Sequence, residues 1–570
     1  MYWNELSKND IYEESLKNSI IRWKFITGLM SFAFVAIILR LFDLSFTTVE
    51  EMNLAYKKQL HSQHIISRAD IVDRNGILLA SNVKTASVYA HPKQLIDAKA
   101  AAKYLVNLRI GLNEKDLLGK LTSNKDFVWI KRHITPIEQQ LIHDLGIPGI
   151  YFVKDERRIY PHENLFAHVL GYVNIDGVGI AGIERLYNNE LIKLGLESKN
   201  MQLSLDVRVQ TILCSEIKNA IDLHSAVGGA GIIINVNSGE ILAMASLPDF
   251  NPHNLNNIKK ESLFNQVALG IYEMGSTFKP FTLAMGLDTN KITLNDAFDV
   301  SKPLKIGKFQ IHDYKGKGGY LSVPEILMYS SNLGVAQIAK LIGAKVQKDY
   351  LNRFGMLREI EENIPGKAKP MFPNERKWSE VSLITISYGH GIAVTGIHLA
   401  QAMAALVNGG LLYKPTLIKQ EDIANIECKR VIKEQTSYTM RKLLRLVVES
   451  GAAKRADVEG LLVGGKTGTA EKNKNGRYSK KLNLAVFAGA FPMNKPEYMV
   501  VVMIDEAKQN SINYGYTTGG MIAAPAGGNV IRRMAQVLGI MHLDHNDKEV
   551  LQAMYLDYIP RHVTTKLAKR

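Results

Sequence analysis

The sequence contains very little cysteine. Cys214 and Cys428 are the two cysteines among its 570 residues, and they lie far apart, so a C-x-x-C redox motif and a cysteine zinc cluster are both excluded. The 15 histidines include no H-E-x-x-H pattern. His61 with His64, and His390 between two glycines, are interpreted as ordinary surface or packing residues. We therefore expect no metal and no cofactor.

A nucleic-acid-binding module is also missing. The formal net charge is +15, but the lysines are spread along the chain and form no basic segment interleaved with aromatic residues. A solvated basic surface accounts for this charge, and the anionic partner that we expect is the phospholipid beside a membrane anchor. The composition, 46% hydrophobic and 22% charged, excludes a disordered chain and predicts more than one domain.

A long hydrophobic run occurs once, near the amino terminus. From Phe25 past Arg40 it covers about 18 residues, close to the ~20 that span a bilayer. No small-x-small cleavage site follows Leu44, which favours an uncleaved anchor over a signal peptide or a buried soluble helix. We predict a tail at 1–24 and an anchor at 25–44. The tail is expected in the cytoplasm because three cations precede the run: Lys17, Arg22 and Lys24.

Several strand-like segments lie in residues 45–216, and none of them carries an arrangement of a nucleophile with a base. Arg68–Gly76 places alternating apolar residues before an Asn-Gly turn, as in a strand and hairpin. We interpret this region as a non-catalytic, elongated, mostly β pedestal that holds the downstream domain away from the membrane.

A candidate nucleophile and base are present further along. If Ser276 opens a helix, Lys279 lies one turn later on the same face. Pro280 is tolerated only in a first turn, so it places the helix start close to Ser276. The S-x-x-K spacing alone is weak evidence because it recurs at Ser81 with Lys84 and at Ser215 with Lys218.

Two further motifs single out Ser276. They are Ser330-Ser331-Asn332 and the chain's single Lys-Thr-Gly, at Lys466-Thr467-Gly468-Thr469. S-x-N also occurs at 198–200 and 511–513, but only one choice gives the order S-x-x-K, S-x-N, K-T-G, the order of penicillin-binding proteins and class A β-lactamases. Strand-like segments lie before and after the motifs, at 231–236, 240–244, 484–489 and 498–504, which predicts one sheet built from distant segments.

The chain resembles class B penicillin-binding proteins over nearly all of its length after the tail. Arg68–Gly76 is similar to the family's R-G-x-I-x-D-R-N-G, with Ala69 in place of glycine, which affects one backbone angle and no reactive group. The resemblance implies an α/β (α+β) transpeptidase fold, a five-stranded antiparallel sheet sandwiched by helices, at 217–545. It also implies a pedestal or dimerisation-like domain at 45–216, followed after the sheet domain by a basic tail at 546–570.

Acyl transfer through Ser276 requires a base. A lysine with an ordinary pKa of about 10.4 is protonated at neutral pH, so the pKa of Lys279 has to be lowered, by burial and by a second cation such as Lys466. Ser330 is then a proton relay and Asn332 a hydrogen-bond partner of Lys279 and of the substrate amide. The alternative, proton transfer by Ser330 and Lys466, stays open.

The resemblance also implies how the substrate is bound. The backbone N–H groups of Ser276 and Thr469 would stabilise the tetrahedral intermediate. Lys466, Thr467 and Thr469 would recognise a substrate carboxylate, with Gly468 allowing a close approach to the strand.

The family implies a peptidoglycan D,D-transpeptidase that cross-links D-alanyl-D-alanine stem peptides through a serine acyl-enzyme, with D,D-carboxypeptidase side activity. β-Lactams would acylate the same serine. A membrane-embedded glycan polymerase and other division proteins are implied partners. The implied location is the bacterial inner membrane, crossed once, with the catalytic domain on the outer, periplasmic side.

The second motif favours the division type (the penicillin-binding protein 3 type) over the elongation type (the penicillin-binding protein 2 type). Leu333-Gly334-Val335 follows it, and the elongation type usually carries aspartate in place of Asn332; 171–177 also resembles the division type. A β-lactam sensor or hydrolase is the other alternative, but no Glu-x-x-Leu-Asn-like segment lies between the second and third motifs. The acceptor amine and the oligomeric state stay open.

Overall fold

The computed structural model describes residues 16–17, 20–41 and 68–562, except 308, 315, 361–363, 367, 375–377, 423–424, 475–476 and 545–546. His61, His64 and residues 563–570 of the predicted tail lie outside this part. The chain divides into two compact units, Met1–Ile66 and Ser67–Arg570.

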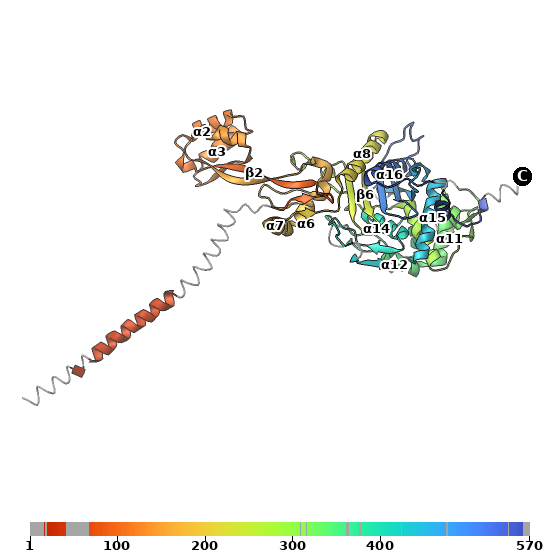
Figure 1. Ribbon diagram of the computed structural model, residues 1–570, viewed down its shortest axis with the longest axis horizontal. Helices are drawn as coiled ribbons and strands as arrows, with labels where there is room; N and C mark the ends of the chain where they lie inside the picture. The colour runs from red at the N-terminus through yellow and green to blue at the C-terminus, as the bar shows by residue number, and fades with distance from the viewer. Residues whose placement is uncertain are drawn as a thin grey trace, which may run out of the picture. The chain divides into compact units, whose positions relative to one another are not determined.

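In the first unit the described residues form a helix, Ile20–Leu41 (Figure 1). With 22 residues it is long and apolar enough to cross a membrane, and it is the one such helix in the part of the chain that the structure describes. The helix begins before the predicted anchor at 25–44, because Arg22 and Lys24 are good helix formers that also suit the water-facing end of a span. Positions 42–44 lie outside the described residues.

The amino-terminal part of the second unit contains a five-stranded sheet and several helices. Strand β2 (Leu78–Ala90) pairs antiparallel with β1 (Ile71–Val72), and the turn between them contains Gly76 at φ +85°, so the predicted hairpin is confirmed. The other strands of this sheet are β3 (Val128–Ile134), β4 (Ile150–Ile159) and β5 (Met201–Gln202). The helices are α2 (Ala98–Asn107), α3 (Glu114–Leu121), α4 (Pro136–His143), α5 (Ala167–Leu170), α6 (Gly182–Leu186) and α7 (Asn188–Leu196).

Arg68 has a structural role in this region. Its guanidinium lies 2.7 Å from the Glu184 carboxylate, which also binds Arg158 at 2.7 Å, and all three side chains are buried. Such buried charges are tolerated because they are paired. Ala69 has no positive φ, so this position does not require the family's glycine.

The carboxyl-terminal part is built on the predicted five-stranded antiparallel sheet, in the order β14-β15-β16-β6-β7. Its strands come from both ends of this part of the chain, as the strand-like segments predicted. They are β6 (Gly228–Asn235), β7 (Ile241–Leu247), β14 (Gly464–Lys474), β15 (Arg477–Phe491) and β16 (Tyr498–Asp505). Strand β14 is an edge strand, paired on one side with β15.

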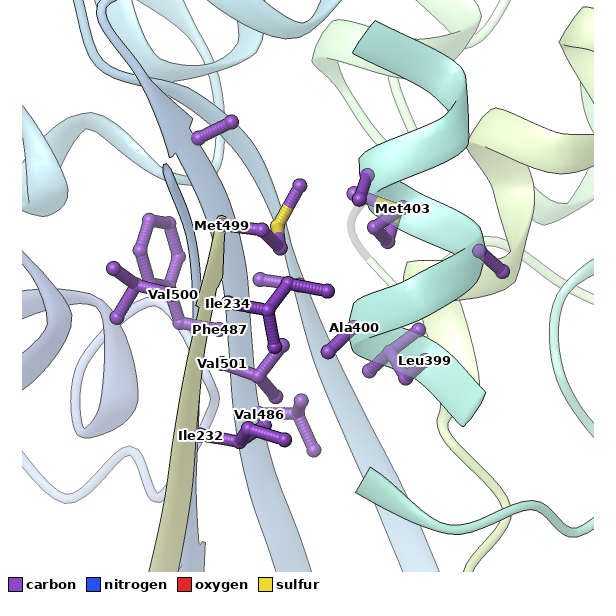
Figure 2. Close-up of a cluster of buried hydrophobic side chains, with 14 of the residues drawn as sticks. Ile232, Ile234, Leu399, Ala400, Met403, Val486, Phe487, Met499, Val500 and Val501 are labelled. Carbon is purple, nitrogen blue, oxygen red and sulfur yellow. The ribbon is translucent and has the colours of Figure 1, made fainter. Parts of the chain in front are cut away.

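Helices cover both faces of this sheet. α8 (Val207–His224) and α16 (Ala523–Leu538) lie side by side on one face, where Gly527 lets α16 approach the ring of Phe487. α14 (Gly396–Val407) covers the other face. Figure 2 shows the alternation along the strands: Phe487 and Val500 point away from α14, whereas residues of three strands point towards it, namely Ile232, Ile234, Val486, Met499 and Val501.

The remaining elements surround this layer. The helices are α9 (Lys279–Asp288), α10 (Val323–Met328), α11 (Asn332–Ile342), α12 (Ala344–Arg353), α13 (Glu380–Ser387), α15 (Glu434–Ser450) and α17 (Lys548–Met554). Three short strand pairs complete the set: β8 (Ala297–Asp299) with β11 (Tyr320–Ser322), β9 (Leu304–Ile306) with β10 (Phe309–Ile311), and β12 (Leu411–Tyr413) with β13 (Cys428–Arg430).

The boundary predicted at 216/217 falls inside α8. This helix packs on β6 and β7, and its amino terminus is capped by Asp206, whose carboxylate accepts from the backbone N–H groups of Arg208 and Val209. Because the whole helix packs on the sheet, we propose that the sheet domain begins at about Asp206.

We expect Ile232→Ala to lower the free energy of unfolding by about 2–5 kcal/mol, because it leaves a cavity between β6 and α14. Ile232 is fully buried there. Chemical denaturation followed by circular dichroism would measure the loss. The matched control is Leu196→Ala, at a residue 68% exposed on α7, for which we expect a change within about 0.5 kcal/mol. Equal losses in both variants would contradict the assigned core.

Candidate active site

Ser276 lies in a 3₁₀ turn, Gly275–Phe278, that runs directly into α9 at Lys279. The predicted helix start is therefore confirmed, with Pro280 in the first turn of α9. The turn is held by a hydrogen bond from the Thr277 hydroxyl to the carbonyl of Met274, at 2.8 Å. Phe278 and Phe281, which flank the lysine, are buried. Ser276 is half-buried and Lys279 is 1% exposed.

The first and third motifs touch through their backbones. A Cβ on Gly275, which has φ +52°, would lie 2.7 Å from the carbonyl oxygen of Thr469. A Cβ on Gly468 would lie 2.4 Å from the carbonyl oxygen of Met274. Both separations are shorter than any real contact, so glycine is required on each side. This close approach sets the Ser276 turn against the edge of β14.

The second motif is joined to the first by Lys279. The Lys279 ammonium donates to the backbone carbonyl and, at 3.1 Å, to the hydroxyl of Ser330. Ser330 lies between α10 and α11 with φ +58°, an uncommon conformation for a residue with a side chain. The structure therefore brings Ser330 to the base candidate, as the motif predicted.

Lys466 provides the second buried cation. It lies on β14, is fully buried, and donates to the backbone carbonyl of Thr467 at 3.1 Å. Burial lowers the pKa of Lys466 to about 7. Burial, and then the charge of Lys466, lower the pKa of Lys279 well below its usual range, while Asp313 acts in the opposite direction. Because the charge on Lys466 acts on Lys279, the two lysines lie in one site.

The hydrogen-bond partner of the Asn332 side chain differs from the predicted one. In the described part of the chain its amide donates to the carbonyl of His312, at 3.0 Å, and Lys279 binds Ser330 instead of Asn332. Asn332 is the first residue of α11, and its backbone N–H donates to Asp313 at 2.5 Å. The side chain therefore braces the loop that carries Asp313.

Asp313 was missed by the sequence analysis. Its carboxylate accepts from the hydroxyl of Ser331, at 2.7 Å, and from the backbone N–H of Leu333, at 3.0 Å, besides Asn332. A carboxylate is favourable at this end of a helix because the N–H groups there carry partial positive charge. No motif contains Asp313, so only its position beside α11 reveals its role.

The third motif lies on the edge strand. Thr467 is buried, and the hydroxyl of Thr469 accepts from the backbone N–H of Gly519, at 3.0 Å. The Thr469 carbonyl faces Gly275, on the unpaired side of β14. The N–H and C=O of a residue in an antiparallel strand point to the same side, so the N–H of Thr469 also points towards the Ser276 turn.

His390 has a partner at the rim of the site. Its Nδ1 lies 3.0 Å from the Glu273 carboxylate, which also accepts from the backbone N–H of Gly391 at 2.8 Å. The preceding Gly389 has φ +84°, and a Cβ on it would lie 2.1 Å from the carbonyl oxygen of Gly275. His390 is thus a packing residue, and the neighbouring Gly389 contacts the Ser276 turn at Gly275, on a third side of that turn.

The other S-x-x-K pairs form no such site. Ser81 and Lys84 lie on β2, where residues three apart point to opposite faces. The hydroxyl of Ser215, on α8, donates to the carbonyl of Ile212 and accepts from Arg533. Among the described residues no group of three or more His, Cys, Asp or Glu side chains is placed to hold a metal ion.

Comparisons with known proteins agree with this geometry. Residues 229–531 match the penicillin-binding protein transpeptidase domain and residues 66–193 the penicillin-binding protein dimerisation domain. The chain is 38% identical over 484 residues to a probable peptidoglycan D,D-transpeptidase FtsI of Caulobacter vibrioides, covering 83% of this chain and 82% of that protein. It is 32% identical over 505 residues to a probable peptidoglycan D,D-transpeptidase PenA of Neisseria meningitidis, covering 83% and 85%.

Solved structures show the same fold. A crystal structure of penicillin-binding protein 3 from Mycobacterium tuberculosis, complexed with ampicillin, superposes with a TM-score of 0.67 at 21% identity, covering 85% of this chain and 98% of that chain. The three motifs that converge on Ser276, the order of the two matched domains and the identity to the curated relatives agree: the chain belongs to the penicillin-binding protein transpeptidase family, division type.

Proposed function

We propose that this protein is a peptidoglycan D,D-transpeptidase of cell division in which Ser276 forms an acyl-enzyme with a stem peptide. The observation that carries the proposal is Lys279: a fully buried amine, one helical turn from Ser276 and bonded to Ser330, whose pKa is lowered by burial and by Lys466. The FtsI and PenA relatives, both named peptidoglycan D,D-transpeptidases, support the substrate.

Lys279 is the group that we assign to the first proton transfer. Its lowered pKa favours the neutral amine, which can accept the proton of Ser276 while the serine oxygen attacks the carbonyl carbon of the D-alanyl-D-alanine bond. Ser330, bonded to Lys279, passes that proton to the nitrogen of the leaving D-alanine. The C–N bond breaks and an ester to Ser276 remains.

Backbone donors stabilise the tetrahedral intermediate. The N–H groups that we assign to this role are those of Ser276 and Thr469, which lie on the turn and the strand that approach each other at Gly275. A preorganised donor of this kind is worth roughly 10²–10³ in rate. Because both are main-chain groups, their position depends on the contact between the turn and the strand and not on either side chain.

The third motif binds the substrate carboxylate in this proposal. Lys466 supplies charge, and Thr467, Gly468 and Thr469 line the open edge of β14 beside it. An amine from a second stem peptide then attacks the ester and completes the cross-link. Water in place of the amine gives D,D-carboxypeptidase side activity. β-Lactams acylate Ser276 as substrate mimics.

The amino-terminal helix sets the location that we propose. The helix Ile20–Leu41 crosses the inner membrane once, with Lys17 and the cations of its first turns, Arg22 and Lys24, on the cytoplasmic side and the catalytic domain in the periplasm. A membrane-embedded glycan polymerase and other division proteins are the proposed partners, since the transpeptidase needs glycan strands to cross-link.

Incubation of the protein with a fluorescent penicillin should give one covalent adduct, on Ser276, located by mass spectrometry of peptides. Ser276→Ala should abolish labelling because it removes the hydroxyl that lies one helical turn from the buried Lys279 amine. Ser81→Ala, which removes the serine of another S-x-x-K pair, should label like the parent protein. An adduct elsewhere, or none on folded protein, contradicts the proposal.

The second-order acylation rate should fall as the pH rises through about 7, the pKa to which burial lowers Lys466. Above that pH Lys466 is neutral and attracts the carboxylate of a penicillin less strongly. Lys466→Arg stays positively charged over this pH range, so its acylation rate should not fall as the pH rises through about 7. A rate that rises through the same pH would instead assign the base to Lys466 with Ser330.

Depletion of the protein in its host should produce filaments, because cross-linking at the septum would stop while elongation continues. Microscopy of cells after depletion gives the result. Re-expression of the parent protein should restore division and re-expression of Ser276→Ala should not. Rounded cells would show an elongation role in place of the division role.

A further inference from the structure

The backbone conformation of Ser330 has to be stabilised by the residues around it. Its left-handed backbone is unfavourable for a residue with a side chain, and such conformations persist when the surrounding structure holds them. Ser330 follows α10 by two residues and precedes α11 by two. Because α10 is only 6 residues long, any group that fixes this helix also fixes the position of the Ser330 hydroxyl.

Glu325 is a buried carboxylate in the first turn of α10 and is 1% exposed. It accepts from the backbone N–H and the hydroxyl of Ser322, both at 2.9 Å, which closes a capping box at the start of the helix. It also accepts from the backbone N–H groups of Arg561 and His562, both at 3.0 Å. Among the described residues, two of the four donors to Glu325 thus come from a segment more than 230 residues away in sequence.

That segment reaches α10 from α17. The hydroxyl of Tyr438 holds the end of α17 through the carbonyl of Ala553, at 3.1 Å, and Ile559 donates its backbone N–H to the side chain of Asn295, at 3.0 Å. The predicted basic tail at 546–570 is therefore packed on the catalytic domain at least as far as His562.

Tyr329, the neighbour of Ser330, is contacted from two directions. The ring of His562 packs edge-on against it, with centroids 5.6 Å apart. The ammonium of Lys317, from the loop that carries Asp313, lies 4.9 Å from the centre of the same ring. The carboxyl-terminal segment and the Asp313 loop thus enclose the residue before Ser330.

We propose that residues 558–562 form a carboxyl-terminal strap that positions Ser330, with Glu325 as the positioning residue. The strap fixes α10 through the two N–H groups that satisfy the buried carboxylate, and through the contact of His562 with Tyr329. Without it Glu325 keeps half of its donors, and a buried charge that loses its donors has to move or become hydrated. This inference rests on the proposed function, because it takes Ser330 to be the proton relay.

The test uses the full-length protein in detergent and a fluorescent penicillin. Acylation is measured at several penicillin concentrations, which separates the limiting acylation rate from the apparent dissociation constant. Truncation after Asp557 removes the strap. The matched control is truncation after His562, which removes only residues outside the described part and retains both backbone donors. Asp557→Asn, at an exposed position with no role in the strap, is a second control.

Glu325→Gln tests the same link without shortening the chain. Glutamine also completes a capping box, but its amide has one acceptor oxygen, so it cannot serve Ser322 and the two strap N–H groups together. We expect the limiting rate to fall about 10-fold or more in this variant and in the truncation after Asp557, since small displacements of catalytic groups have large effects. The dissociation constant and both controls should stay at the parent values.

The combination of Glu325→Gln with the truncation should be no slower than the truncation alone, because the truncation already removes the N–H groups that Glu325 binds. A parent-like limiting rate in the truncation after Asp557, or in Glu325→Gln if the truncation does not fold, overturns the strap. The strap is also overturned if these variants lose only thermal stability while the acylation rate per labelled molecule stays unchanged. Absence of label on Ser276 in the parent protein overturns the proposed function itself, and the strap with it.

Discussion

The contact between the Gly275 turn and the edge of β14 is the constraint on which the rest of the site depends. At Gly275 and Gly468 no side-chain atom separates the two backbones, so the turn that carries Ser276 and the strand that carries Lys466 are in direct contact. Gly389 closes the turn from a third direction. The sheet supplies the rigidity: β14 is held by β15, and α14 and the α8–α16 pair clamp the layer from both sides.

The two buried lysines, Lys279 and Lys466, destabilise the folded protein when they carry their charge. Lys466 has a pKa of about 7 when folded, against about 10.4 for an unfolded lysine, so between these values the unfolded chain binds more protons than the folded one. Folding is therefore disfavoured at the lower end of that window and gains stability as the pH rises through it. The large apolar core on both faces of the sheet offsets this, and the same burial lowers the pKa of Lys279.

Local pattern explains which features were predictable. The helix start at Ser276, the hairpin before Gly76 and the strands on either side of the motifs follow from residues a few positions apart, and a known motif order identified Ser330 and Lys466. Asp313 and Glu325 could not be found in this way, because each acts on residues brought near only by the fold. The contact of the Asn332 amide with the His312 carbonyl could not be found for the same reason, because no spacing encodes this loop contact; the predicted bond from Asn332 to the substrate amide stays a prediction.

The open side of β14 has a consequence for the shape of an acceptable ligand. An unpaired ladder accepts main-chain groups at the regular interval of a β-strand, so a ligand that lies beside it has to be extended, with its own amides aligned to continue the sheet. Under the proposed function, a stem peptide in that form would add a sixth strand, and its register would decide which of its carbonyls faces Ser276. Selection of the scissile bond is then a matter of alignment along the strand as much as of recognition of any one side chain.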